Sequence, residues 1–283
     1  MEADQLNKFI SQALAEDIAG GDHTSLACIP EGSRSSAELL IKDIGVVAGV
    51  EVAAQIFKHL DPDSTLTVNF QDGEDVTHGN IAFVVECNTR ALLSAERLVL
   101  NTMQRMSGIA TLSSRFAVEI EGMDVKVLDT RKTTPLLRFL EKAAVRIGGC
   151  ENYRFGLYDW IMIKDNHIDA CGGIHQAIDS IHAYLKEKNL SLRITVEVRN
   201  LVELYEVLRR GGVDRIMLDN FELPIIEEAV KIIDGAFESE VSGGVTLSTV
   251  RLIARTGVNY ISVGALTHSG GSLDMSLNIV RPD

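Results

Sequence analysis

The stretch VKVLDTRKTT at residues 125–134 is a short run of aliphatic and β-branched residues that ends in polar and basic side chains. The stretch WIMIKDNH at residues 160–167 repeats this arrangement. Each apolar run has the composition of a buried strand, and a helical pattern follows each polar cluster. In α/β enzymes the carboxyl ends of parallel strands are where catalytic and binding residues gather. The two stretches therefore predict a parallel α/β fold with a site at its strand ends.

The same strand and helix unit recurs through the rest of the chain. Predicted strands cover residues 125–128, 160–163, 194–198, 215–219, 239–242 and 260–263. Helical patterns lie between them, at 135–146, 173–187, 200–211, 223–233 and 247–256. Continuous apolar strands that alternate with amphipathic helices indicate a parallel sheet buried on both faces. Six such units predict an incomplete barrel, short of the usual eight strands.

The N-terminal third has a different pattern, which is typical of an α+β domain. Helical spacing covers residues 4–16, 52–60 and 91–119, with Gly108 as a candidate kink in the last of these. Strand patterns cover 37–49, 65–70 and 80–86. We therefore predict an α/β protein in which an N-terminal α+β domain at 1–116 packs on an incomplete, about six-stranded parallel α/β barrel at 117–283, C-terminal tail included.

Composition narrows the class of function. The 283 residues are 46% hydrophobic and 24% charged, as in ordinary globular proteins. A formal net charge of -13 argues against nucleic acid as a partner. No apolar run approaches the roughly 18 residues of a membrane span, so no membrane partner is expected. The four cysteines are scattered without a C-x-x-C pair, which favours reduced thiols and a cytoplasmic protein.

A basic segment stands out in this acidic chain. Residues 131–164 carry seven Lys and Arg residues against three acidic ones. Arg131, Lys132, Arg154 and Lys164 are candidate ligands for anions, because Arg pairs with a carboxylate through two parallel bonds and Lys acts as a point charge. The segment predicts a pocket for an anionic small molecule. His167 is either a general acid or an organiser of its loop.

Glycines mark a candidate phosphate site after two later strands. Ser242, Gly243 and Gly244 precede a predicted helix, and Gly264 follows the next strand. Glycine lets backbone N–H groups approach an oxyanion, and a helix N-terminus adds a favourable dipole. His268 follows Gly264 closely and is a further candidate contact to phosphate.

Two acidic residues end neighbouring predicted strands. Glu197 and Asp219 stand among apolar residues. Their oxygens suit Mg²⁺, which keeps much of its hydration and takes further ligands from substrate phosphates. The alternatives are that they bind a sugar hydroxyl, or that they are structural acids bonded to loop amides or to Lys and Arg.

Specific motifs extend along nearly the whole chain. They are LAED at 14–17, GDHTS at 21–25, ER at 96–97 with LN at 100–101, SGIAT at 107–111, DTRKTTP at 129–135, IKDNHI at 163–168, IMLDN at 216–220, VSGG at 241–244 and ISVGALTHS at 261–269. With these motifs the chain resembles the type II phosphoribosyltransferases, and among them the quinolinate phosphoribosyltransferase family. The resemblance implies a reaction of quinolinate with phosphoribosyl pyrophosphate and Mg²⁺ that yields nicotinate mononucleotide, CO₂ and pyrophosphate on the route to NAD.

The resemblance also implies roles for individual residues. The expected quinolinate ligands are Arg131, Arg154 and Lys164, with Lys132 on pyrophosphate and Glu197 and Asp219 on the ribose and metal. Lys132, Lys164, Glu197 and Asp219 are the expected catalytic residues. The expected phosphate site is Ser242, Gly243, Gly244, Gly264 and His268, and the same motifs add Thr133, Tyr153, Ala265 and Leu266 to the substrate-binding set. Arg97 matches a residue that enters the neighbouring subunit's site, which implies a homodimer with shared sites and leaves a hexamer open.

Two positions depart from the family pattern. Tyr153 stands where the family usually has His, and Leu136 where it usually has Gly. A phenol can donate a hydrogen bond but carries no positive charge, so the acceptor could be another aromatic acid, as in the molybdenum-associated homologues. A third hypothesis is a phosphate-ligand binding protein without catalysis. The four intact basic residues favour quinolinate, and Glu197 with Asp219 argues against a simple binder.

Overall fold

The computed structural model describes residues 3–280, which form two compact units. The first unit contains the chain up to Ser114, the segment Thr134–Gly149 and the segment from Ser269 onward. The second unit contains Arg115–Thr133 and Cys150–His268. The sequence pattern predicts one boundary near residue 116. The first unit also takes in two later segments, which a single boundary does not describe.

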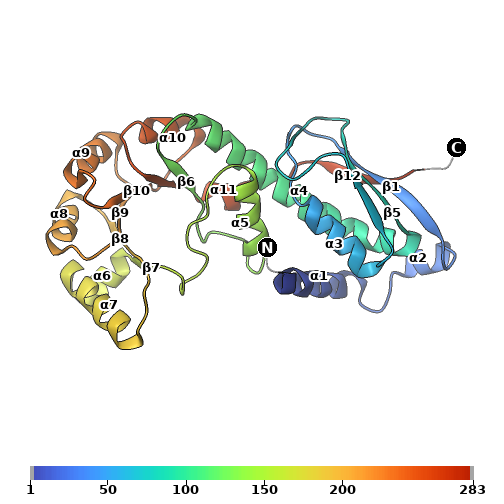
Figure 1. Cartoon of the computed structure of the whole chain (residues 1–283), viewed down its shortest axis with the longest axis horizontal. Helices are drawn as coiled ribbons and strands as arrows, with labels where there is room; N and C mark the ends of the chain where they lie inside the picture. The colour runs from blue at the N-terminus through green and yellow to red at the C-terminus, as the bar shows by residue number, and fades with distance from the viewer. Residues whose placement is uncertain (1–2, 281–283) are drawn as a thin grey trace. The chain divides into compact units, whose positions relative to one another are not determined.

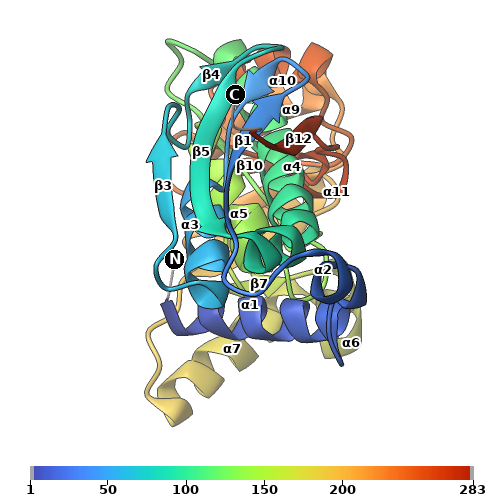
Figure 2. The same cartoon turned by 90° about the vertical axis from the view of Figure 1, so that its right-hand side faces the viewer.

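The first unit is built on an antiparallel sheet. Its strands are β1 (Arg34–Ile41), β3 (Thr65–Val68), β5 (Ile81–Asn88) and β12 (Met275–Ile279), in the order β12-β1-β5-β3 (Figure 2). Ala37, Leu39 and Ile41 alternate along β1 and are fully buried, as expected of a sheet with one face on a core. The predicted strand region at 37–49 divides after β1, and β2 (Gly45–Val46) pairs with β4 (Asp75–Val76).

The helices of this unit follow the predicted spacing except for the short helix at residues 23–28, which the sequence pattern did not predict. They are α1 (Ala3–Ile18), α2 (His23–Cys28), α3 (Val50–Leu60), α4 (Thr89–Glu119) and α5 (Arg138–Ile147). Helix α4 is a single 31-residue helix that continues into the second unit. Gly108 lies inside it, where a Cβ would come within 2.6 Å of the Gly271 carbonyl oxygen. Close packing of the C-terminal segment, rather than a helix break, therefore explains this glycine.

The second unit is the predicted parallel sheet. Its strands are β6 (Lys126–Leu128), β7 (Ile161–Ile163), β8 (Ile194–Val198), β9 (Arg215–Asp219), β10 (Glu238–Ser242) and β11 (Tyr260–Ser262). They pair in the order β6-β11-β10-β9-β8-β7, and every pair is parallel. Within the described residues β6 and β7 are the two edges, so the barrel is incomplete. The predicted fold class is confirmed.

Helices follow the strands and surround them. They are α6 (Asp165–Cys171), α7 (Ile174–Lys188), α8 (Leu201–Arg210), α9 (Leu223–Ile233), α10 (Leu247–Ala254) and α11 (Ala265–His268). Figure 1 shows α7, α8, α9 and α10 along the outside of the strands. Buried residues such as Leu204 and Val207 of α8 face the sheet side at helical spacing. The helices therefore cover the sheet along its flanks.

The apolar character of the helices and the state of the cysteines can be compared with the sequence-based expectations. None of the helices in the part of the chain from 3 to 280 is long and apolar enough to cross a membrane. The four cysteines are free thiols, and burial raises the pKa of Cys87 and of Cys150 to about 12. These two thiols are therefore protonated at neutral pH, as expected of structural cysteines.

Candidate active site

A cavity of about 760 Å³ opens where the strands of the second unit end. Its lining draws on residues at or just after the carboxyl end of each of the six strands, because parallel strands present these ends on one side. The cavity brings together most of the residues predicted from the sequence, namely Arg131, Lys132, Tyr153, Arg154, Lys164, Glu197, Asp219, Ser242, Gly243, Gly244, Gly264, Ala265 and His268.

Three of the predicted residues do not line it. Leu266 is fully buried in α11. Thr133 is half-buried, and its backbone N–H donates to the Arg131 carbonyl oxygen at 2.9 Å. Arg97 lies on α4 in the first unit with its side chain exposed. An exposed guanidinium is available to another subunit, so the role expected for Arg97 stays a prediction.

Basic residues form one part of the lining. Arg154 is only 9% exposed, and its guanidinium donates to the Trp160 carbonyl oxygen at 3.2 Å and to Met162 Sδ at 3.5 Å. Burial lowers the pKa of Arg154, and the nearby positive charge of Arg131 lowers it further. The unperturbed pKa of arginine is so far above neutral pH that Arg154 stays charged. Two guanidinium groups held close together in this way favour a bound anion.

Lys164 and Glu197 form an ion pair inside the cavity. Lys164 Nζ lies 2.6 Å from Glu197 Oε2, and the glutamate side chain is 14% exposed. The backbone N–H of Lys164 donates to His167 Nδ1 at 2.9 Å. That bond commits the imidazole to the start of α6, so His167 acts as the loop organiser that the sequence left as one alternative. Lys164 therefore presents a fixed charge beside Glu197.

The glycine segment before α10, predicted to bind phosphate, has a backbone conformation that favours glycine. Gly243 has φ +96° and Gly244 φ +61°, values that side chains rarely tolerate. Ser242 Oγ donates to Asp219 Oδ1 at 2.6 Å, which joins the cradle to the end of β9. Asn220 completes this corner, because its Nδ2 donates to Asp219 Oδ2 at 2.7 Å.

The segment after β11 closes the other side of the cradle. A Cβ on Gly264 would lie 3.0 Å from Lys132 Cδ and 3.3 Å from His268 Nε2, so the three residues are packed tightly together. Thr267 Oγ1 donates to the Lys132 carbonyl oxygen at 2.8 Å. The ends of β6 and β11 are thus joined around a lysine, a histidine and a glycine backbone, a suitable arrangement for phosphate.

Several lining residues were not selected from the sequence. They are Thr130, Met162, Met217, Asn220, Val245, Thr246, Ser262 and Val263. Met162, Met217 and Ser262 each stand two residues before a predicted site residue, and successive strand side chains alternate between faces. The two-residue repeat of strand side chains could therefore have identified these three residues from the sequence. Asn220, at φ +57°, was detectable as an asparagine directly after a strand-end acid.

The acidic side chains of the cavity fit a metal ion that shares its ligands with a substrate. The described residues hold no group of three or more His, Cys, Asp or Glu side chains that could bind a metal ion by themselves. Glu197 and Asp219 still line the same cavity beside the phosphate cradle. Two hard oxygen donors fit an ion such as Mg²⁺ whose other ligands are water and phosphate.

Comparison with known protein families identifies the chain. The family model described as "Quinolinate phosphoribosyl transferase, C-terminal domain" matches residues 109–278, and the one described as "Quinolinate phosphoribosyl transferase, N-terminal domain" matches residues 22–107. The chain belongs to the quinolinate phosphoribosyltransferase family. The family resemblance predicted from the motifs is confirmed.

Other members of the quinolinate phosphoribosyltransferase family match over nearly the whole chain. Quinolinate phosphoribosyltransferase [decarboxylating] 1b of Nicotiana tabacum is 45% identical and aligns over 97% of this chain and 82% of its own length. A probable nicotinate-nucleotide pyrophosphorylase [carboxylating] of Bacillus subtilis (strain 168) is 41% identical over 97% of this chain and 93% of its own. The solved structure of NadC from Streptococcus pyogenes superposes with a TM-score of 0.92 at 37% identity, covering 99% of both chains.

Proposed function

We propose that this member of the family is an enzyme that transfers a phosphoribosyl group from phosphoribosyl pyrophosphate to quinolinate, with loss of CO₂, in NAD biosynthesis. The observation that carries the proposal is a single cavity in which Arg131, Arg154 and Lys164 lie together with the glycine cradle and two acids. The cations suit a dicarboxylate, and the cradle suits a sugar phosphate. The names of its relatives support this function and give no support to another aromatic acid or to a simple binder.

The chemistry follows from where the charges stand. Arg131 and Arg154 hold the quinolinate carboxylates, while the residues around Gly243 and Gly264 hold the 5′-phosphate. The pyridine nitrogen bonds to the ribose carbon as the bond from that carbon to pyrophosphate breaks, and positive charge develops on the ribose. Glu197 and Asp219 stabilise this charge electrostatically. The carboxylate next to the nitrogen then leaves as CO₂, and a proton takes its place on the ring carbon.

Mg²⁺ is part of the proposal. Glu197 and Asp219 would hold the ion together with phosphate oxygens of the substrate, and the ion would supply positive charge to the departing pyrophosphate. Lys132 and Lys164 line the same cavity and add positive charge to it. Removal of Mg²⁺ by a chelator is expected to abolish turnover while leaving quinolinate binding measurable by calorimetry. Turnover that continues after Mg²⁺ has been removed would refute the metal assignment.

Assembly and compartment belong to the same proposal. We propose a homodimer in which Arg97 completes the partner's site, and a hexamer stays open. The exposed position of Arg97 on α4 supports this arrangement. Four free thiols support a reducing compartment such as the cytoplasm. Sedimentation measures the assembly, and fractionation of the source cells measures the compartment; a monomer or an organellar protein would contradict these two points.

The first experiment is a steady-state assay of nicotinate mononucleotide formation with Mg²⁺ and phosphoribosyl pyrophosphate. Quinolinate and nicotinate are compared as acceptors, and pyrophosphate release is followed in parallel. Turnover with quinolinate and its absence with nicotinate are expected, because the two guanidinium groups are placed for a dianion. Pyrophosphate release without quinolinate consumption would overturn the acceptor. No release with any aromatic acid would overturn the enzymatic function.

A further inference from the structure

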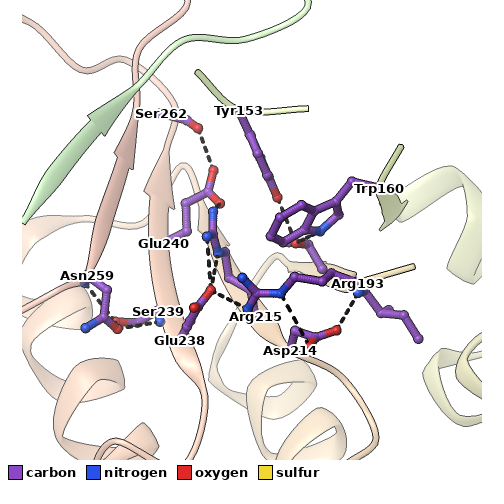
Figure 3. A network of polar contacts seen from close by, with 12 residues as sticks. Tyr153, Trp160, Arg193, Asp214, Arg215, Glu238, Ser239, Glu240, Asn259 and Ser262 are labelled. Atoms are coloured by element: carbon purple, nitrogen blue, oxygen red, sulfur yellow. Dashed lines mark hydrogen bonds and ion pairs between the residues drawn. The ribbon is translucent and has the colours of Figure 1, made fainter. Parts of the chain in front are cut away.

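A layer of polar groups that includes two buried charges lies among the strands of the second unit (Figure 3). Arg215 of β9 is 3% exposed, and Glu240 of β10 is fully buried. Arg215 Nη1 donates to Glu240 Oε2 at 2.9 Å, Arg215 Nε donates to Glu238 Oε2 at 3.0 Å, and Ser262 donates to Glu240 Oε1. Burial raises the pKa of Glu240. Burial alone would lower the pKa of Arg215, but its interactions with Glu240 outweigh that effect, and the pKa of Arg215 is raised. Buried charges persist only when paired in this way.

Two aromatic side chains contact this layer, and one of them, Tyr153, also lines the cavity. Tyr153 and Trp160 pack edge to face, with ring centroids 5.4 Å apart. The Arg215 guanidinium carbon lies 5.1 Å from the Tyr153 centroid and 5.0 Å from that of Trp160. Figure 3 shows the tyrosine hydroxyl directed into the polar layer. The tyrosine therefore lines the cavity with its ring, while its hydroxyl group is engaged below the floor.

A single hydroxyl group joins the two aromatic residues. Thr195 Oγ1 of β8, in a fully buried residue, lies 2.7 Å from the Tyr153 hydroxyl oxygen and 2.9 Å from Trp160 Nε1. An indole N–H can only donate, so Thr195 Oγ1 accepts from Trp160 and its own proton is available to Tyr153. Tyr153 and Glu240 also interact, which opposes the larger effect of burial that raises the Glu240 pKa. Trp160, Thr195 and Tyr153 are thus joined at one hydroxyl group.

Arg154 is linked to both aromatic residues that Thr195 Oγ1 bonds, because it follows Tyr153 in the sequence and donates to the Trp160 carbonyl. Its neighbour Tyr153 is fixed at the backbone as well, since the Tyr153 N–H donates to buried Asp129 Oδ1 at 2.8 Å. The carbonyl of Trp160 accepts from the Arg154 guanidinium at 3.2 Å. Thr195 Oγ1 therefore bonds two residues next to Arg154: Tyr153, which precedes it, and Trp160, whose carbonyl orients its guanidinium.

We propose that Thr195 is a positioning residue for acceptor binding, which holds the Arg154 guanidinium in place through Tyr153 and Trp160. The proposal rests on the proposed function insofar as Arg154 is an acceptor ligand. A guanidinium held before the ligand arrives loses little conformational freedom on binding, so carboxylate affinity is gained through preorganisation. The threonine itself is not among the residues that line the cavity, so it acts on acceptor binding through its two aromatic partners.

Thr195→Val tests this assignment, because valine has nearly the same shape and lacks the hydroxyl group. We expect the KM of this variant for quinolinate to rise about tenfold or more, because a displaced Arg154 guanidinium would lose a charged hydrogen bond to the acceptor. The KM for phosphoribosyl pyrophosphate should stay within about twofold, since the phosphate cradle is built by β10 and β11. Thr195→Ser restores the hydroxyl and should recover quinolinate use.

Ser239→Ala is the matched control. Ser239 is 3% exposed in β10, and its hydroxyl donates to Asn259 Oδ1 at 3.0 Å, away from Tyr153 and Trp160. Loss of this buried hydroxyl should lower stability without a selective change in the quinolinate KM. Equal KM changes for Thr195→Val and Ser239→Ala, or equal changes in both substrate KM values for Thr195→Val, would overturn the positioning role.

Two readouts do not depend on turnover. Trp160 is the one tryptophan of the sequence, so its emission reports the bond to Thr195 directly and should shift in Thr195→Val and return in Thr195→Ser. A crystal structure of Thr195→Val should show the Arg154 guanidinium displaced from the Trp160 carbonyl. If Arg154 keeps its place there, the proposal fails even when the enzyme uses quinolinate. If Arg154 moves but the wild-type chain does not turn over quinolinate, the proposed function fails and the positioning role stands.

Discussion

Replacing Gly243 by alanine perturbs the phosphate cradle at the point where the structure leaves least room. A Cβ at this position would lie 2.2 Å from Asn220 Oδ1 and 2.9 Å from the Asn220 backbone nitrogen. Asn220 is held from two sides, because its backbone N–H donates to the Ser242 carbonyl at 2.9 Å and its amide donates to Asp219 at 2.7 Å. The added methyl group therefore meets backbone that is already bonded, and the corner between β9 and β10 must move.

The expected cost has two parts. A residue with a Cβ in a left-handed conformation costs about 1–2 kcal/mol relative to its usual backbone region. Forcing the Asn220 corner apart adds about 1–3 kcal/mol, as overpacking generally does. Gly243→Ala should therefore lower the free energy of unfolding by about 2–5 kcal/mol. Gly244→Ala is the matched comparison: Gly244 also has positive φ, but a Cβ there would meet no atom within 4 Å, so only the first part, about 1–2 kcal/mol, applies.

Equilibrium urea unfolding measures both variants. Trp160 lies in the same unit as Gly243 and Gly244, so its fluorescence follows the unfolding of that unit. The midpoint should fall further for Gly243→Ala, with an unchanged dependence on urea concentration. Gly243→Ala should also raise the KM for phosphoribosyl pyrophosphate. Equal destabilisation of the two variants would show that the Asn220 corner yields freely, and would refute the reasoning.

Three further predictions test the proposed roles. Arg131→Ala should raise the KM for quinolinate about 100-fold, since truncating a charged partner costs about 3 kcal/mol, while phosphoribosyl pyrophosphate binding measured by calorimetry changes little; an equal loss for both substrates would contradict the assignment. Arg97→Ala and Glu197→Gln should each be inactive, and mixed subunits should recover up to about a quarter of the wild-type activity if a dimer shares its sites; no recovery despite proven subunit exchange would exclude sharing. Asp61→Asn should cost about 1–3 kcal/mol at pH 7, because Asp61 accepts hydrogen bonds from the Asn88 and Asp63 N–H groups and from Arg34. The hydrogen bond from Asn88, with smaller contributions from the other two, lowers the pKa of Asp61 in the folded protein. The stabilisation is therefore fully present above the unfolded pKa of about 3.9 and is lost as the pH falls through the folded pKa. Urea unfolding across pH measures this, and a cost of Asp61→Asn that persists in acid would rule out the charge as its source.

Local pattern was sufficient for the barrel and for most of its site. A strand of the parallel sheet is a short apolar run, and the residue that ends it must lie at the carboxyl end, so Asp219 and Ser242 could be placed from the chain alone. Gly243 could be selected because positive φ is a property of one residue and its immediate neighbours. The cavity that these strand ends form contains most of the residues predicted from the motifs.

Pattern was insufficient wherever a contact joins distant segments. The helical spacing at 135–146 predicts a helix of the barrel repeat, yet residues 134–149 belong to the first unit. Their amphipathic spacing is the same in either place, because periodicity identifies a buried face but not the partner that buries it. The same limit applies to Gly108, whose close approach to Gly271 exists only once the C-terminal segment returns to α4.

The sequence by itself therefore determined the family, the parallel sheet and the ring of polar residues at its strand ends, since each of these is encoded in short contiguous motifs. Only the tertiary structure decided the direction of the Tyr153 hydroxyl group and the place of Thr195 beneath it. Thr195 is separated from Tyr153 by 42 residues and from Trp160 by 35. The register of β8 against β7 and β9 brings these groups together, and no local preference of a buried threonine foretells which two aromatic residues it will join.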